Sequence, residues 1–122
     1  SNNILTLSNI SYFMAETKDY QGSIKYSTIG LNKKELTDQQ KGLFYSNRSY
    51  ALIGLEKFKE AEIDASKSIK ILPNNSFPYY FRAKANIGLN KLESVCNDLN
   101  MSKKLGGINM TKELLKQYCK EQ

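Results

Sequence analysis

The chain has 122 residues, of which 40% are apolar and 25% are charged, a composition typical of one globular domain and unlike that of a disordered or fibrous chain. It contains no histidine and no tryptophan, so catalysis by Ser-His-Asp or Cys-His groups and metal sites with histidine ligands are excluded. The net charge is +6, but Arg48 and Arg82 are the only arginines among 18 basic residues, which favours a solvated lysine surface over a nucleic-acid reader.

The first predicted pair of helices occupies residues 4–37. In this segment Tyr20, Ile24 and Leu31 recur at helical spacing on one face. Thr37 is followed three residues later by Gln40, which is the spacing of a capping box. We therefore expect a new helix to begin directly after Thr37.

Two further segments, 45–72 and 79–106, repeat one pattern. Ten of the 28 aligned positions are identical. They are Tyr45/Tyr79, Arg48/Arg82, Ala51/Ala85, Ile53/Ile87, Gly54/Gly88, Leu55/Leu89, Lys57/Lys91, Asp64/Asp98, Ser68/Ser102 and Lys70/Lys104. The offset between the two segments matches the period of about 34 residues that is typical of stacked helix–turn–helix repeats.

Turn residues divide the rest of the chain. Pro73 and the two asparagines that follow it predict a helix end and a cap for the next helix. Gly106 and Gly107 predict another helix end, and Asn109 is the expected N-cap of a last helix over 110–121. The predicted organisation is a degenerate repeat at 4–37, repeats at 38–75 and 76–109, and a C-terminal capping helix at 110–122.

Several of these residues carry a family resemblance. They are Tyr45, Ser46, Asn47, Arg48, Ser49, Gly54, Phe58, Ala61 and Pro73, with matching positions at Tyr79, Ala83, Gly88, Leu92 and Val95. Over about residues 4–109 this pattern resembles the tetratricopeptide repeat. The resemblance implies an all-α, right-handed superhelical solenoid of about three repeats with a capping helix. The chain departs from the family pattern at Arg48 and Arg82, where an aliphatic residue is usual, and at Gly106 and Gly107, which replace a proline.

The family resemblance also implies a concave groove that binds a peptide or a partner's helix. The candidate groove residues are Tyr12, Asn47, Tyr50, Ile53, Phe77, Tyr80, Phe81, Lys84 and Ile87. Tyrosine and phenylalanine offer a large contact area with few rotatable bonds, which suits peptide capture. For Phe77 and Phe81, packing against the second repeat is an equal alternative.

One subfamily grips the C-terminal carboxylate of a chaperone with two lysines, two asparagines and an arginine, and only Asn47 matches that set. The other positions hold side chains that cannot donate a charge to a carboxylate, namely Ser8, Tyr12, Phe77 and Phe81. We therefore expect a protein or peptide partner other than a chaperone tail. Lys84 is the one cationic groove candidate that would attract an acidic segment, and a solvated lysine without a partner is the alternative.

The chain has two cysteines. Cys96 and Cys119 lie 11 residues before and 12 residues after Gly107, so two antiparallel helices would bring them nearly level. A disulfide and two buried thiols are both open readings. A disulfide would imply an oxidising compartment and would favour an exported or periplasmic protein over a cytoplasmic one. The C-terminal pattern from Leu105 to Cys119 also resembles the ends of repeat proteins from Bacteroidetes-type bacteria.

Catalytic and cofactor motifs are absent from the sequence. There is no CxxC pair, metal cluster or glycine-rich phosphate loop, and Glu60 and Asp64, one helical turn apart among lysines, are expected to form a solvated face. No apolar run approaches the roughly 20 residues of a membrane span. The sequence predicts a protein-interaction module that is not an enzyme and has no cofactor. The alternative is a single-stranded nucleic-acid-binding helical repeat that stacks bases on aromatic rings.

Overall fold

The structure is a computed structural model that describes residues 4–120, and it is all-helical. The described residues form seven helices and no strand. The helices are α1 (Ile4–Glu16), α2 (Tyr20–Leu31), α3 (Asp38–Gly54), α4 (Phe58–Ile71), α5 (Ser76–Gly88), α6 (Val95–Lys104) and α7 (Ile108–Tyr118). The predicted all-α class is confirmed, and the arrangement is consistent with a helical repeat.

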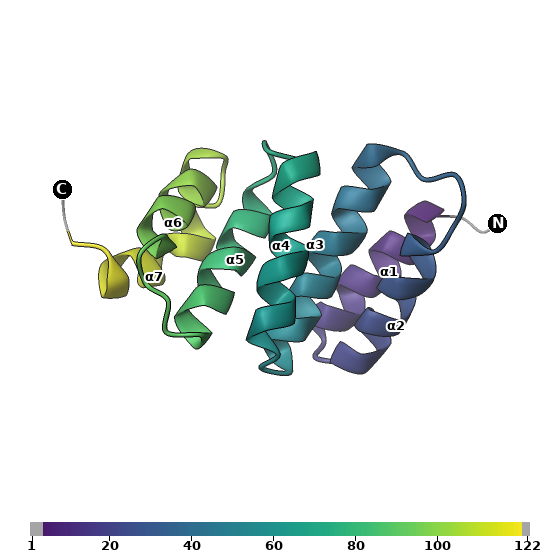
Figure 1. The fold of residues 1–122 in the computed structure, drawn as a ribbon, viewed down its shortest axis with the longest axis horizontal. Helices are drawn as coiled ribbons and strands as arrows, with labels where there is room; N and C mark the ends of the chain where they lie inside the picture. Colours follow the sequence, from purple (N-terminus) through teal and green to yellow (C-terminus); the bar gives the residue numbers. More distant parts are fainter. Residues whose placement is uncertain (1–3, 121–122) are drawn as a thin grey trace.

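The helices follow one another along a row. Figure 1 shows α1 and α2 at the N-terminal end, α3 and α4 in the middle, and α6 and α7 at the C-terminal end. Each helix packs mainly against its neighbours in the chain, with additional contacts between α1 and α3 and between α3 and α5. None of the helices at residues 4–120 is long and apolar enough to cross a membrane.

Local capping residues determine where several helices begin. The Thr37 side chain accepts a hydrogen bond from the Gln40 N–H at 3.1 Å, and the Thr37 N–H donates to Gln40 Oε1 at 2.9 Å, so the predicted capping box is confirmed. Asn75 caps α5 by accepting from the Phe77 N–H at 2.9 Å. This contact confirms that the turn after Pro73 supplies the cap of the following helix.

The predicted N-cap of the last helix is wrong. Helix α7 begins at Ile108, its N-cap is Gly107, and Asn109 lies inside the first turn. Gly106 has a φ of 115°, a conformation that favours glycine, and after this turn the helix begins two residues earlier than expected. At the other end, α7 stops at Tyr118 because Cys119 is extended. Residues 121–122 of the predicted helix lie outside the described part of the chain.

An aromatic ring packs on a glycine at the end of a helix in two places. The two glycines occupy equivalent positions in the repeated segments. A methyl group added to Gly54 would overlap the ring of Tyr20, and one added to Gly88 would overlap the ring of Phe58. Both rings stand at the first residue of a helix, α2 and α4, and both glycines are the last residue of a helix, α3 and α5. Glycine is therefore needed at 54 and 88 for the close approach of ring to backbone.

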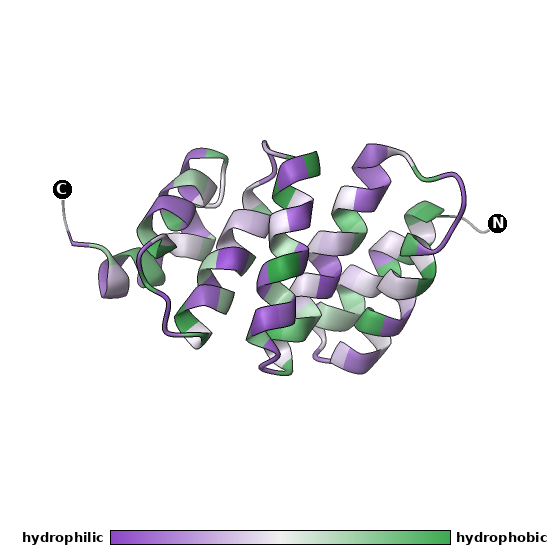
Figure 2. Ribbon diagram, viewed as in Figure 1, coloured by the Kyte–Doolittle hydropathy of each residue, from purple (hydrophilic) through white to green (hydrophobic). Residues whose placement is uncertain are grey.

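Two clusters of small and aliphatic residues at the helix crossings form part of the core, which also contains the buried ring of Phe44. One cluster contains Leu52, Ala61 and Ala85, and the other contains Ala83, Val95 and Leu99. Figure 2 shows that individual helices carry hydrophobic and hydrophilic residues side by side, as expected where each helix buries only part of its circumference. Alanine at these crossings lets the helices approach closely.

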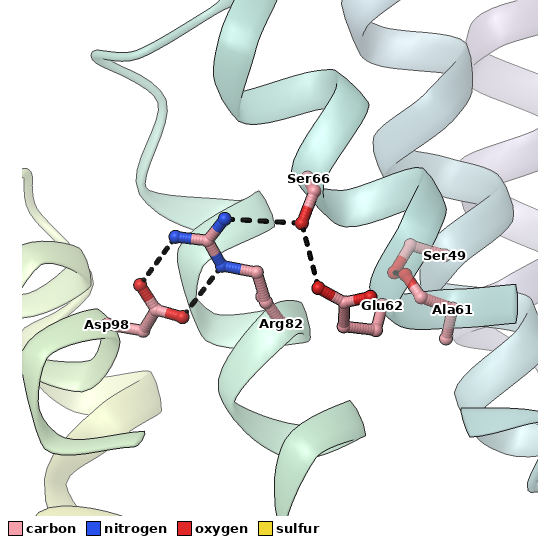
Figure 3. Close-up of polar contacts among 6 residues, drawn as sticks. All are labelled: Ser49, Ala61, Glu62, Ser66, Arg82 and Asp98. Carbon is pink, nitrogen blue, oxygen red and sulfur yellow. Dashed lines mark hydrogen bonds and ion pairs between the residues drawn. The ribbon is translucent and has the colours of Figure 1, made fainter. Parts of the chain in front are cut away.

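Two ion pairs with buried aspartates occupy equivalent positions in the two repeated segments. Arg48 donates through Nε and Nη2 to the two oxygens of Asp64, at 2.8 and 3.1 Å. Arg82 binds Asp98 in the same bidentate manner, at 2.8 and 2.9 Å (Figure 3). Asp64 is only 4% exposed, so the prediction that it lies on a solvated face is wrong. The reason is that Arg48 reaches across from α3 and binds Asp64 on α4.

Each arginine also reaches the preceding pair of helices. Arg48 Nη1 donates to Thr28 Oγ1 in α2 at 3.1 Å, and Arg82 Nη1 donates to Ser66 Oγ in α4 at 3.2 Å (Figure 3). One guanidinium thus links three helices. The two arginines at equivalent positions of the repeated segments thus have the same structural role.

Candidate functional site

The candidate site is an aromatic groove formed by two neighbouring hollows. The first hollow has a volume of about 280 Å³ and is lined by Glu16, Tyr20, Tyr50, Ile53, Gly54, Phe77, Tyr80, Phe81, Lys84 and Met110. The second has a volume of about 220 Å³ and is lined by Ser8, Asn9, Tyr12, Leu43, Ser46, Asn47, Asn75, Phe77 and Phe81. Phe77 and Phe81 line both hollows, so the two are parts of one surface.

Five aromatic rings from α1, α3 and α5 form a chain of contacts in this groove. They are Tyr12, Tyr50, Phe77, Tyr80 and Phe81. The ring centroids of Tyr50 and Phe81 are 4.9 Å apart and stacked. Tyr12 lies 5.9 Å from Tyr50 and 6.1 Å from Phe77. Such pairs stabilise one another beyond the area that they bury. The groove therefore has a preformed aromatic wall.

The two phenylalanines of this wall differ in exposure. Phe81 is 4% exposed and Phe77 is 39% exposed. Phe81 is thus a core side chain that supports Tyr50 from behind, whereas Phe77 is open to solvent between the two hollows. Of the two, Phe77 has the surface to contact a ligand.

A carboxylate lies beside the tyrosines of the groove. The Tyr50 hydroxyl donates to Glu16 Oε2 at 2.8 Å. Burial raises the pKa of Tyr50, and the hydrogen bond to Glu16 and the charge of Glu16 raise it further. The pKa of Tyr12 is raised by burial and by a hydrogen bond to the same carboxylate. Both hydroxyls therefore stay protonated and act as donors at neutral pH.

The polar groove candidates have partners within the protein. Asn47 is buried, and its Nδ2 donates to the Ser8 carbonyl and to Ser11 Oγ, each at 3.0 Å. These amide protons tie α3 to α1 and do not face a ligand. The Nζ of Lys84 lies 5.3 Å from the ring centroid of Tyr80, at cation–π distance.

The two isoleucine candidates differ in position. Ile53 lines the first hollow and also packs against the cluster around Leu52. Ile87 lines neither hollow and packs against the cluster of Ala83, Val95 and Leu99. The remaining candidates all line the groove, namely Tyr12, Tyr50, Phe77, Tyr80, Phe81 and Lys84.

Nine lining residues of the two hollows were not among the sequence candidates, and Glu16, Tyr20 and Met110 have the largest side chains among those in the first hollow. Glu16 is one helical turn after Tyr12, so helical spacing in α1 was the available signal. The sequence pattern identified Tyr20 only as a repeat position. Met110 reaches the groove because α7 folds back toward α5, and nothing local in the sequence indicates this.

Comparison with known proteins adds a similarity to a heat shock protein. No family model matches the chain. Heat shock protein STI1 of Saccharomyces cerevisiae is 31% identical over 92 residues, which are 75% of this chain. The chain spans only 15% of the length of that protein. The similarity and the all-helical structure fit a domain of the tetratricopeptide-repeat type.

A disulfide joins the last two helices of the described chain. Cys96 in α6 is bonded to Cys119, the C-cap of α7, with their Cα atoms 5.7 Å apart. No cysteine in the described part of the chain is free. The side chains of Leu114, Leu115 and Tyr118 in α7 pack on the cluster of Ala83, Val95 and Leu99. The disulfide therefore holds α7 over α5 and α6, where Met110 completes the groove.

No cluster of metal-ligating side chains lies in the described part of the groove. Among residues 4–120, no three histidine, cysteine, aspartate or glutamate side chains lie close enough together to hold a metal ion. What the groove does offer is a set of aromatic faces, one carboxylate and one ammonium. These groups suit the recognition of a side chain or a peptide.

Proposed function

We propose that the chain is a non-catalytic protein-interaction module that binds a peptide or a partner helix in the aromatic groove. The observation that carries this proposal is the preformed wall of Tyr12, Tyr50, Phe77 and Phe81 between two hollows. Aromatic side chains that are held in place before binding lose little conformational entropy when a ligand arrives. The similarity to a heat shock protein supports a protein partner.

The proposal includes a repeat organisation. Repeats at 4–37, 38–75 and 76–109, followed by a capping helix at 110–122, would stack as a right-handed superhelical solenoid. Three observations support it: the repeated sequence pattern, the two ion pairs at equivalent positions, and the two ring-on-glycine contacts. In such a stack, α1, α3 and α5 would line one side and present the groove.

A chaperone C-terminal tail is not the proposed ligand. A carboxylate-gripping site requires several positively charged and amide side chains facing the groove, whereas Lys84 is the single cationic residue that lines the two described hollows of the groove. The Nδ2 protons of Asn47 already bind Ser8 and Ser11. The presence of one lysine in the groove also counts against a single-stranded nucleic acid as the ligand, because its phosphates need several cations along a groove.

The proposed compartment follows from the disulfide. A bond between Cys96 and Cys119 would persist in an oxidising compartment, which favours an exported or periplasmic protein. Titration of thiols in natively sourced, denatured and unreduced protein tests this. Two free thiols would contradict the proposal. An origin in Bacteroidetes-type bacteria stays a prediction from the C-terminal sequence pattern.

The groove is tested by selecting peptides from a random display library and measuring their affinities by fluorescence polarisation. We expect Tyr50→Ala and Tyr80→Ala each to weaken binding about tenfold or more, as removal of an aromatic anchor does. The matched control is Phe13→Ala, because Phe13 is an exposed aromatic side chain of α1 that lines neither hollow. All three variants should keep the helical circular dichroism spectrum.

Two results would contradict the proposed groove. One is a set of peptides whose affinity survives both tyrosine substitutions and is lost in Phe13→Ala. The other is selection of single-stranded oligonucleotides that bind with a steep salt dependence in preference to peptides, which would favour the nucleic-acid alternative.

A further inference from the structure

The charge of the groove differs from the charge of the whole chain. The chain carries +6, yet the charged lining residues of the two hollows are one carboxylate, Glu16, and one ammonium, Lys84. Both line the first hollow. The lining of the second hollow holds no charged side chain. Charges elsewhere on the surface are screened over about 8 Å at physiological salt, so the local pair decides which ligand charge is recognised.

The Glu16 carboxylate is held in place by a hydrogen bond, but it can accept further hydrogen bonds. The Tyr50 hydroxyl donates to its Oε2 at 2.8 Å, and burial together with the same carboxylate raises the pKa of Tyr12. A carboxylate accepts about four hydrogen bonds, so the bond from Tyr50 leaves acceptor capacity for another donor. Glu16 is itself exposed. Within the described chain, the carboxylates in ion pairs are Asp64 and Asp98, and Glu16 is not one of them.

Lys84 does not neutralise Glu16, although both line the same hollow. Its Nζ lies over the ring of Tyr80, 5.3 Å from the centroid. An ammonium group is thus already held against an aromatic face of this hollow. The rings of Tyr20 and Tyr50 line the same space as Glu16, and aromatic faces attract cations.

We infer that the peptide bound in the groove places a basic side chain, lysine or arginine, against Glu16, with an apolar side chain of the same segment on Phe77. This inference rests on the proposed function. The N–H donors of the basic side chain bind the Glu16 carboxylate beside the Tyr50 hydroxyl, and its alkyl stem lies along the tyrosine rings that line the same hollow. Phe77, 39% exposed, offers the adjoining apolar surface.

The test uses three acetylated and amidated octapeptides that share a frame of glycine, serine, leucine and phenylalanine. They differ at one central position, which is lysine, norleucine or glutamate. Each is titrated into the ¹⁵N-labelled full chain, and affinity is measured from the amide shifts of groove residues. We expect the lysine peptide to bind about three- to tenfold tighter than the norleucine peptide, the range for a partly exposed ion pair with a cation–π contact.

Variants assign this preference to Glu16. Glu16→Gln should remove the preference for lysine, because it keeps the size of the side chain and loses the charge. The matched control is Glu35→Gln, which changes the net charge equally at an exposed position that lines neither hollow. The control should keep the full preference.

The outcomes separate this inference from the proposed function. If the norleucine peptide binds the groove as tightly as the lysine peptide, or if the glutamate peptide binds most tightly, the basic-side-chain inference is overturned and the peptide groove stands. A preference that survives in Glu16→Gln also overturns the inference. If none of the three peptides shifts any groove signal, both are overturned.

Discussion

At the scale of single residues, the least expected feature is a charged side chain that works inside the helix stack. Arg48 and Arg82 each bind an aspartate through two hydrogen bonds and a hydroxyl of the preceding helix pair through a third. The side chain of Asp64 is 5% exposed and that of Arg48 is 23% exposed. A planar guanidinium has five N–H donors in a fixed fork, which lysine could not replace.

Removing the charge of the buried partner should destabilise the fold. Asp64→Asn keeps the size of the side chain but leaves the guanidinium of Arg48 without its charged partner, and we expect the free energy of unfolding to fall by about 2 kcal/mol. Urea denaturation followed by circular dichroism measures this. The matched control is Glu60→Gln, one turn earlier on α4 and exposed, which should change stability by less than about 0.5 kcal/mol. Equal effects of the two substitutions would show that Asp64 is solvated in solution.

At the scale of helices, capping residues determine where α3 and α5 begin, and glycines at their ends allow aromatic rings to pack closely against them. The capping box at Thr37 starts α3, and Asn75 starts α5. Helix α3 then ends at Gly54 and α5 ends at Gly88, where the rings of Tyr20 and Phe58 take the space of a side chain. The recurrence of glycine at the same position of both repeats thus has a packing reason.

The contact between Phe58 and Gly88 predicts that Gly88→Ala lowers the stability of the protein, although alanine favours a helix more than glycine does. Alanine has a higher helix propensity than glycine by about 1 kcal/mol, but its methyl group at 88 would lie 2.5 Å from the ring of Phe58. We expect Gly88→Ala to lower the free energy of unfolding by about 1–2 kcal/mol, since overpacking outweighs propensity. Lys70→Ala, at an exposed position of α4, is the control and should be nearly neutral. A stabilised Gly88→Ala protein would show that the ring moves away freely.

At the scale of the whole molecule, the C-terminal end is closed by α7 and a disulfide. Helix α7 covers the cluster of Ala83, Val95 and Leu99 with one face and supplies Met110 to the groove. The end of a helical stack otherwise exposes an apolar face. Closure of this end therefore also completes the candidate site.

Loss of the disulfide should destabilise the protein and act first on α7. The bond closes a loop with a sequence separation of 23 residues, for which chain-entropy arithmetic gives about 3 kcal/mol. We expect the Cys96→Ser/Cys119→Ser double variant to lose stability of that order in urea, and amide hydrogen exchange to rise most in α7. Wild-type protein reduced with dithiothreitol is the control, because it loses the same bond with no change of side chain. Identical exchange in α7 with and without the bond would contradict the role given to it.

The sequence by itself determined the helical class, the repeated pattern, the capping box at Thr37 and the cap at Asn75, because periodicity and capping depend on residues within a few turns of one another. It also indicated most of the aromatic groove residues, since helical spacing places Phe77 and Phe81 on one face. Only the tertiary structure decided that Asp64 is buried against Arg48, that Asn47 donates its amide protons to α1, and that Glu16 and Met110 meet in one hollow. It also brought the Cα atoms of Cys96 and Cys119 to 5.7 Å. Each of these contacts joins different helices, and their geometry depends on how the helices cross, which no local pattern specifies.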